Sequence, residues 1–336
     1  MSQPLQILHM IAELDGYGTT GQLRILVDYQ LAAGHQVQVL ALSAEGQVLG
    51  EWQKQGVACR VLDQRWRLDP FAVWRLAQWL RRNSYDVLHT WDPVARGYSR
   101  AVRRVSATPC VSRTIAPGIS TAPPSDCSRE QFLQEMALPK RAQLIAVAGQ
   151  LLRHKRIDEA IWSFELVRTI NDSAHLLVIG DGPDRPRLER FTRLASQSSA
   201  IRFLGYRPDV RQLLPHIDVF WQTGETLLAG FEAMAAQVPL VVSDTAASRA
   251  AIQESETGYR VHWNDRAAWA RQTLRLMEDP VLAKRIGSNG ARQIAVQFPV
   301  STLTETYAAL YDQKLVPVAP PHELSKNAVG SIPGNH

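Results

Sequence analysis

The chain has 336 residues, 45% hydrophobic and 21% charged, so it is long enough for two domains with separate cores and has the composition of a globular protein. No stretch approaches the roughly 18–20 uninterrupted apolar residues that a membrane-spanning helix needs. The first residues lack the basic region and cleavage site of a signal peptide, and three scattered cysteines are typical of reduced thiols, so we expect a cytoplasmic protein.

The net charge of +5 is unevenly distributed, because residues 60–113 contain eleven arginines and no lysine against four aspartates and no glutamate. The expected helices 72–83 and 94–105 carry many of these arginines opposite an apolar face. Two interpretations stay open: helix faces in contact with solvent, or a peripheral contact with anionic lipid head groups at the inner face of a membrane or with a phosphate-bearing acceptor. No nucleic acid partner is expected, because no aromatic platform or reading helix accompanies the arginines.

In the first part of the chain, short apolar strands alternate with helical patterns. Helices are expected near 21–33, 70–83 and 93–105, and strands near 5–11, 37–42, 59–62, 86–89 and 109–113. The stretch "APGISTAPPSDCS", residues 116–128, is rich in Pro and Ser and is the best candidate for a linker.

A second alternating block follows the linker. Its strands are expected near 143–149, 175–180, 201–204, 217–221, 239–242 and 259–261. After residue 263 the pattern is helical, and the Pro-rich, polar tail from Leu315 is expected to be disordered. Two strand–helix blocks predict an α/β protein with two doubly wound domains: a first domain at 1–114, a linker at 115–128, a second domain at 129–314 and a tail at 315–336.

Ligands of doubly wound sheets bind where strands end, so three loops of the second block are candidates. "VAGQLLRHKR" contains Gly149 and Gln150 and places Lys155 at the start of a helix, which suits a phosphate, although a basic turn in solvent reads the same way. Gly182 in "VIGDGPDRPRL" permits close backbone approach, and Asp209 in "FLGYRPDVRQLL" is placed to cap a helix. Taken singly, these last two fit an ordinary strand–helix turn and an ordinary cap.

The stretch "TGETLLAGFEAMAAQVPLVVSD" is a fourth candidate. In a helix from about residue 226, Leu227, Phe231 and Met234 face the core and Glu232 lies on a flank. Glu225 shares that flank if the first turn is helical, so two carboxylates would accept hydrogen bonds from sugar hydroxyls in an interdomain cleft. Taken alone, the pair is better explained as two exposed helix glutamates.

Together these segments resemble the group 1 glycosyltransferases of family 4, which have the GT-B fold. The resemblance rests on the order "VAGQLLRHKRIDEAI … LLVIGDGP … IRFLGYRPDVRQLLPHIDVFW … FEAMAAQVPLVVSD … ETGYRV" within residues 143–262. "LVDYQLAAGHQVQVL" and "YDVLHTWDP" are similar to the first domain of such enzymes, and "IAPGIS" to their hinge strand.

The resemblance implies transfer of a sugar from a nucleotide donor to a glycan or lipid-linked acceptor, with retention and without a bound metal or a cofactor. Lys155 would bind the donor diphosphate and Glu232 would accept from the ribose hydroxyls. Tyr206 and Arg207 would lie along the base. Further donor contacts are implied for Gly18, Thr19, Gly149, Gln150 and Gly182.

The sequence departs from the family pattern at three places. Gln150 stands where the family has an arginine, and Glu225 is one residue out of the spacing of the family's two glutamates, so that Gly224 occupies the formal position. The first domain lacks several dozen residues after the strand near 109–113, and Arg113 or Thr114 stands where that strand often ends in a histidine in the family. The candidates for catalysis are therefore Glu225, Arg113 and His89, and for His89 the alternative is a polar strand end.

Two alternatives follow from these departures. A degenerate GT-B protein would bind nucleotide or sugar without transfer, as a partner subunit of another transferase. A GT-B epimerase ranks lowest, because "FEAMAAQVPLVVSD" resembles the transferases.

Overall fold

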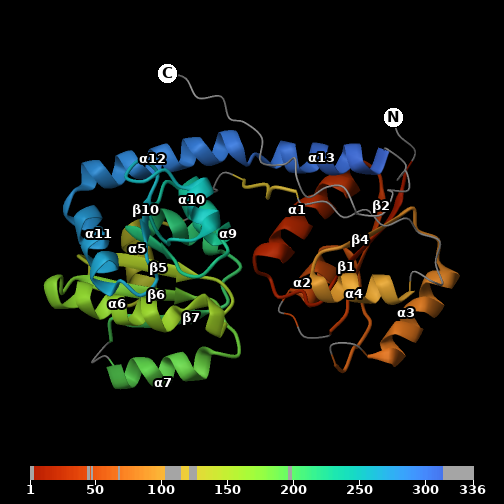
Figure 1. Ribbon diagram of the computed structural model, residues 1–336, viewed down its shortest axis with the longest axis horizontal. Coiled ribbons are helices and arrows are strands. Elements are labelled where there is room, and N and C mark those ends of the chain that lie inside the picture. Colours follow the sequence, from red (N-terminus) through yellow and green to blue (C-terminus); the bar gives the residue numbers. More distant parts are fainter. Residues whose placement is uncertain are drawn as a thin grey trace.

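The computed structural model describes residues 4–43, 46, 48–66, 69–102, 115–120, 127–195 and 199–312. Figure 1 shows two lobes, one built from the first part of the chain and one from the second, with α12 and α13 running along the same side of both. Each lobe has a parallel sheet covered by helices, as expected for two doubly wound α/β domains.

The first lobe has a four-stranded sheet in the order β3-β2-β1-β4. Its strands are β1 (Gln6–Ile11), β2 (Gln36–Ala41), β3 (Ala58–Val61) and β4 (Val87–Thr90). Its helices are α1 (Gly18–Ala32), α2 (Leu49–Lys54), α3 (Pro70–Arg82) and α4 (Pro93–Val102). The strand expected near 109–113, with Arg113, lies outside the described residues.

The alternation of apolar residues explains this lobe, because it gives each sheet face its own core. One face packs against α1 and α2 through residues that include Ile11, Leu23 and Trp52. The other packs against α3 and α4 through residues that include Leu8, Leu76 and Tyr98. Asp69 caps α3 by accepting hydrogen bonds from the backbone N–H groups of Phe71 and Ala72.

The second lobe has a six-stranded sheet in the order β10-β9-β8-β5-β6-β7. Its strands are β5 (Gln143–Ala148), β6 (Ala174–Ile179), β7 (Ile201–Gly205), β8 (Val219–Gln222), β9 (Leu240–Ser243) and β10 (Tyr259–Val261). Its helices and 3₁₀ turns are α5 (Arg129–Glu135), η1 (Arg153–Lys155), α6 (Ile157–Ile170), α7 (Arg185–Ala195), α8 (Val210–Leu213), η2 (Leu214–His216), α9 (Leu228–Ala235), α10 (Ala246–Ala251), α11 (Arg266–Glu278) and α12 (Pro280–Gln297).

The strand order reverses between β5 and β8, which are neighbours in the sheet. The chain goes from β5 outward to β6 and β7 and then returns to β8 on the other side of β5. A crevice opens outside the carboxyl ends of the strands at such a reversal. The loops that follow β5 and β8 are therefore brought together, and they contain Lys155 and Thr226.

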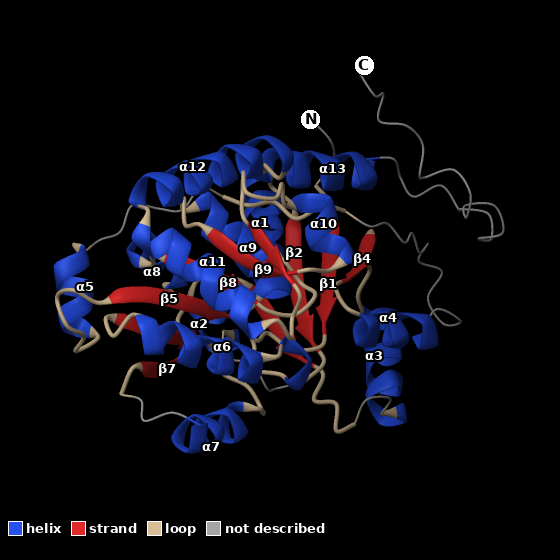
Figure 2. Cartoon of the chain, turned by 60° about the vertical axis from the view of Figure 1, so that its left-hand side comes forward, coloured by secondary structure: helices blue, strands red, loops and turns tan. Residues whose placement is uncertain are grey.

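The chain crosses between the lobes twice, and the two crossings touch. The first is the segment 115–120, and the second leads from α12 into α13 (Val300–Asp312). The backbone N–H of Ile119 donates to the carbonyl of Phe298 at 2.7 Å. A Cβ atom on Gly118 would lie 3.0 Å from side-chain atoms of Leu303, so glycine lets the crossings pack closely. In Figure 2, α13 continues the line of α12 and comes to lie beside the first sheet.

Candidate functional site

A cleft of about 400 Å³ separates the lobes. Loops after β1, β5, β6 and β7 open into it, and it is walled by α1, α8 and α9 and by charged residues of α1 and α2. Of the predicted donor-binding residues, it is lined by Gly18, Gly149, Tyr206, Arg207 and Glu232. Contacts predicted in both lobes therefore meet at this cleft, whereas Thr19, Gln150, Lys155 and Gly182 are not among its lining residues.

The first-lobe wall is the loop after β1, which touches the second lobe. Gly16 has a φ of +79° and lies so close to Tyr206 that a Cβ atom would be 2.3 Å from its hydroxyl oxygen. The hydroxyl of Tyr17 accepts from the backbone N–H of Asp181 at 2.6 Å and lies 3.2 Å from its carbonyl oxygen, to which it donates. Burial raises the pKa of Tyr17 to about 12, so the hydroxyl keeps its proton near neutral pH.

Gly18 begins α1 directly after this loop, and the N-cap residue supplies no side-chain hydrogen bond. The N–H groups of the first turn therefore lack a capping side chain, which suits an anionic group. Thr19 is exposed and is not part of the cleft wall, whereas Thr20 is. The hydroxyl of Thr20 donates to Asp15 at 2.7 Å, which fixes the turn that leads into the helix.

The lysine predicted to bind phosphate lies in the second lobe, in the loop after β5, but it is not among the residues that line the cleft. Lys155 closes η1 and donates a hydrogen bond to the hydroxyl of Thr226, which precedes α9. Burial lowers the pKa of Lys155. Gly149 has a φ of +141°, and Gly182 lies so close to the carbonyl oxygen of Leu151 that a Cβ atom would be 2.5 Å away. Both glycines are thus required by the backbone geometry beside the cleft.

Glu232 lies on α9 with 21% of its side chain exposed, and it faces the cleft. Its Oε1 accepts a hydrogen bond of 2.9 Å from Arg211 of α8. The other branch of the Arg211 guanidinium donates to the hydroxyl of Ser120 at 2.7 Å. The predicted ribose-binding carboxylate is therefore linked through one arginine to the segment that crosses between the lobes.

Tyr206 and Arg207 both line the cleft, but Arg207 is already paired. Its guanidinium donates to both carboxylate oxygens of Asp209, at 2.7 and 2.6 Å. This pair corrects the expected cap, because Asp209 occupies the N-cap position of α8 without a side-chain hydrogen bond to the helix. The hydrogen bonds from the Arg207 guanidinium hold the pKa of the Asp209 carboxyl below its usual value.

Glu225 does not share a face with Glu232. The helix begins at Leu228 and not near 226, and Gly224 has a φ of +80°, which takes the chain out of helical geometry. Glu225 is exposed in the intervening bend. The condition under which the two carboxylates would align, a helical first turn, is thus not met.

His89 belongs to an aromatic cluster beneath α13 and does not line the cleft. Its ring stacks on Trp91 with 4.6 Å between centroids, and its Nδ1 is 2.9 Å from the hydroxyl of Tyr311. Burial, followed by the neighbouring His9, holds the pKa of His89 well below its ordinary value. This position favours the interpretation of His89 as a polar strand end.

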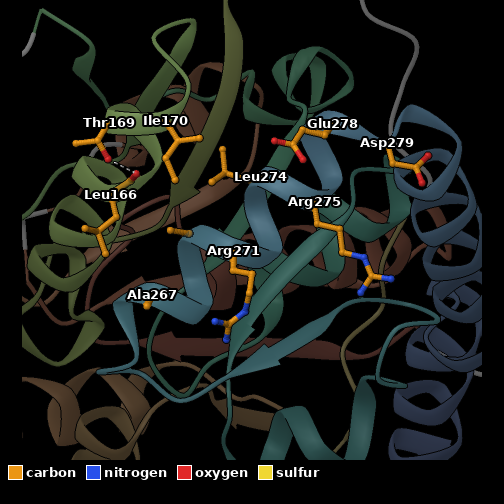
Figure 3. A pocket seen from close by; sticks show the side chains of 10 residues that line it. Leu166, Thr169, Ile170, Ala267, Arg271, Leu274, Arg275, Glu278 and Asp279 are labelled. Carbon is orange, nitrogen blue, oxygen red and sulfur yellow. Dashed lines mark hydrogen bonds between the residues drawn. The ribbon is translucent and has the colours of Figure 1, made fainter.

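A larger hollow, of about 680 Å³, lies between α6 and α11. Figure 3 shows apolar side chains from both helices beside Arg271, Arg275 and Glu278 of α11. None of the predicted site residues lines it, and it shares no residue with the cleft. The cleft is therefore the candidate site in spite of its smaller volume. Among the described residues, no group of three His, Cys, Asp or Glu side chains is placed to hold a metal ion.

Tyr17 and Arg211 were not identified from the sequence. Each makes its defining contact with a residue far away in the chain, at separations of 164 and 91 positions. For Arg211 the only signal is its place in "DVRQLL", next to a loop predicted to lie along the base. For Tyr17 it is the two glycines on either side, which allow the close approach of the lobes.

Two family models match the chain. Residues 128–293 match the family described as glycosyl transferases group 1, and residues 18–114 match the family described as Glycosyltransferase Family 4. The two matches together span both lobes and more than half of the chain.

Among characterised relatives, the chain is similar to the N-acetyl-alpha-D-glucosaminyl L-malate synthase of Bacillus anthracis, with 26% identity over 54% of this chain and 50% of that protein. It is also similar to the N,N'-diacetylbacillosaminyl-diphospho-undecaprenol alpha-1,3-N-acetylgalactosaminyltransferase of Campylobacter jejuni, with 25% identity over 55% of this chain and 48% of that protein. The matches thus cover about half the length of these relatives.

The fold is that of a solved structure, HepE of Anabaena in complex with UDP and glucose. The TM-score is 0.80 at 13% sequence identity, over 92% of this chain and 99% of that one. The two lobes facing a cleft are therefore the GT-B fold.

Proposed function

The chain belongs to the group 1 glycosyltransferases, and on that premise we propose that it moves a sugar from a nucleotide donor to a glycan or lipid-linked acceptor. The observation that carries the proposal is the cleft itself, in which Glu232, Gly149 and the uncapped start of α1 face one another across the two lobes. A nucleotide diphosphate has groups that match both walls. Its ribose hydroxyls would donate to the carboxylate of Glu232, and its diphosphate would accept from the N–H groups at the start of α1.

The donor we propose is a UDP-sugar, since HepE, which has the same fold, holds UDP and glucose. Lys155 and the first turn of α1 would stabilise the charge that builds up on the leaving diphosphate, which would make a bound metal unnecessary. Retention at the sugar carbon is the outcome that the family resemblance favours. Closure of the lobes would exclude water from the reacting carbon.

The acceptor we propose is a sugar carried on a lipid. The relative from Campylobacter jejuni is named for an acceptor of that kind, a diphospho-undecaprenol. An arginine-rich surface of the first lobe, formed by α3 and α4, fits the same interpretation because it also exposes aromatic rings. Trp66, Phe71 and Trp74 are 53%, 70% and 62% exposed. Aromatic rings beside arginines are typical of surfaces that lie at a lipid–water boundary.

The transfer proposal is tested by incubating the protein with UDP-sugars and lipid-linked sugar acceptors, with and without EDTA. We expect a product that keeps the anomeric configuration of the donor, at a rate that EDTA leaves unchanged. A protein that binds UDP but neither transfers nor slowly hydrolyses any donor in the panel would instead be the degenerate binding protein. Binding of no nucleotide at all would contradict both.

The lipid contact predicts that the double substitution Phe71→Ala, Trp74→Ala releases the protein from vesicles that contain phosphatidylglycerol. Sedimentation with vesicles measures this, and each ring is expected to contribute about 1 kcal/mol or more through buried apolar area. The control is Leu194→Ala, Val296→Ala, which removes two apolar side chains elsewhere that are even more exposed, at 82% and 76%. No helix within the described ranges is long and apolar enough to span a membrane. Equal loss of binding in both double variants would contradict the prediction.

A further inference from the structure

We infer that Arg211 is a positioning residue for the nucleotide: it holds the carboxylate of Glu232 in the orientation that recognises the ribose and anchors it to the interdomain crossing. The inference rests on the proposed function, because it takes Glu232 as the group that accepts hydrogen bonds from the ribose.

The guanidinium of Arg211 forms a fork between two acceptors. The two terminal nitrogens of Arg211 donate to different partners, Oε1 of Glu232 at 2.9 Å and the hydroxyl of Ser120 at 2.7 Å. The side chains of Arg211 and Glu232 are 30% and 21% exposed, so the pair is shielded from water without being sealed from the cleft. A guanidinium is planar and holds two acceptors at a fixed angle, which a flexible ammonium cannot do.

The carboxylate of Glu232 can accept further hydrogen bonds besides the one from Arg211. Arg211 occupies one carboxylate oxygen, and each such oxygen accepts more than one hydrogen bond. Because Glu232 lines the cleft, the remaining capacity faces the space that a ribose would fill. A carboxylate held in one rotamer loses less entropy when it binds the ribose, so the arginine would increase affinity without touching the nucleotide.

Ser120, the second acceptor of the Arg211 guanidinium, connects the pair to the first crossing segment. Ser120 ends the described part of the first crossing segment, in which Gly118 is held on both sides by Gln22 of α1. The Gln22 side chain accepts from the N–H of Gly118 at 2.8 Å and donates to its carbonyl at 2.9 Å. The carboxylate is thus connected through Arg211 and this segment to the helix that forms the opposite wall of the cleft. Its orientation depends on how the two lobes are placed.

The test measures how well the protein distinguishes UDP from 2′-deoxy-UDP by calorimetry. A ribose hydroxyl bonded to a carboxylate gives the wild type about tenfold preference for UDP. We expect Glu232→Gln and Arg211→Gln each to reduce this preference to about twofold or less, since both leave the ribose without an oriented carboxylate. The double variant is expected to behave like either single variant, because the two residues act as one unit.

Two further variants separate positioning from general stability. Arg211→Lys keeps the charge but not the fork, so it should restore only part of the preference. Arg266→Gln is the matched control: Arg266 also pairs with a carboxylate, Glu159, at 2.9 Å, and stacks on Trp162, away from the cleft. It should leave the preference unchanged. The thermal midpoint of each variant shows whether it is folded.

The outcomes distinguish this inference from the proposed function. If Arg211→Gln weakens binding of both nucleotides equally, the residue is merely structural and the inference is wrong. If Glu232→Gln keeps the full preference for UDP, the site assigned under the proposed function is wrong as well. If the wild type binds UDP and 2′-deoxy-UDP equally, the carboxylate of Glu232 does not recognise the ribose. The ribose role of Glu232 and the positioning role of Arg211 are then both wrong.

Discussion

At the scale of single residues, the charge of Lys155 gives the most direct test of the donor site. Its ammonium is half-buried and donates to Thr226, and burial lowers its pKa. A lysine with a lowered pKa loses its charge at a lower pH than a free lysine does, so an interaction that depends on the charge weakens earlier as pH rises. This gives the donor site a pH signature.

We expect Lys155→Ala to weaken UDP binding by about tenfold or more, which corresponds to the loss of a charge-assisted hydrogen bond. In the wild type, affinity should fall on the alkaline side before the pH at which free lysine titrates. Lys155→Arg should keep affinity constant over that range, because arginine stays protonated. Calorimetry from pH 7 to 10 makes the measurement, with Lys140→Ala, at an exposed ion pair, as the control. An unchanged affinity in Lys155→Ala would remove Lys155 from the site.

At the scale of secondary-structure elements, α13 is held to the first sheet by a buried polar cluster. His9 is completely buried in β1; its Nε2 lies 2.7 Å from Oε1 of Gln30, and its Nδ1 accepts from the indole N–H of Trp91. Trp91 stacks on His89, which is bonded to Tyr311 of α13. Burial raises the pKa of Tyr307, also on α13, to about 12, and burial raises the pKa of Tyr311 as well. Both tyrosines therefore face the histidines with neutral hydroxyls.

This cluster predicts loss of stability in acid. Burial lowers the pKa of His9 from 6.5 to about 4, so between these values the unfolded chain takes up a proton that the folded protein refuses. The free energy of unfolding should therefore fall as pH decreases from about 6.5 towards 4, by about 2 kcal/mol at pH 5 from this residue. Denaturant titrations at pH 7.5 and pH 5 measure it. His9→Gln should show less acid sensitivity than the wild type, whereas His154→Gln, at an exposed histidine, should match the wild type. Equal acid sensitivity in all three proteins would contradict the assignment.

Elements with a clear sequence period were predicted within one or two residues, including β1, β5 and β9. Their apolar runs are long enough to define a strand by themselves, and the Pro at position 70 marks the start of α3. The helix α2 was missed because its six residues are too few to show a period. The start of α9 was misplaced because a bond between Lys155 and Thr226 and the positive φ of Gly224 are decided by neighbours that the local sequence does not reveal.

The candidate site divides along the same line. Glu232 and Gly149, which line the cleft, were singled out from the ends of strands together with the family resemblance. Roles that depend on partners from another lobe were not, because no local signal encodes which side chain arrives opposite. Arg211 and Tyr17 are of this kind, and so is His89, whose surroundings are set by a helix more than 200 positions later.

At the scale of the whole molecule, the lobes meet through Tyr17. Its hydroxyl satisfies both the N–H and the carbonyl of Asp181, and its ring meets that of Tyr206 edge-on at 5.7 Å between centroids. Since the pKa of Tyr17 is raised to about 12, this contact does not change near neutral pH. The contact favours the arrangement in which the cleft is narrow.

Tyr17→Phe should therefore shift the protein towards more open arrangements. Losing the hydrogen bonds of one hydroxyl costs the closed state about 1 kcal/mol, or about a fivefold change in the ratio of closed to open molecules. Small-angle X-ray scattering should show a larger radius of gyration for this variant without nucleotide, and saturating UDP should reduce the difference. Tyr29→Phe, at an exposed tyrosine of α1, is the control. A scattering curve identical to that of the wild type would mean that Tyr17 does not hold the lobes together.

The way the two crossings pack has a consequence for recombining such enzymes. Gly118 is pressed against Leu303, and α13 contacts α1 and the histidine of β4, although α13 follows the second lobe in the chain. A hybrid that joins the first lobe of this protein to the second lobe of a relative at residues 115–128 would leave a foreign final helix on this cluster. A hybrid with two junctions, one there and one between α12 and α13, would inherit matched surfaces on both sides. Exchange of donor specificity by recombination therefore calls for a cassette bounded near residues 120 and 299, with residues 300–312 kept alongside the first lobe.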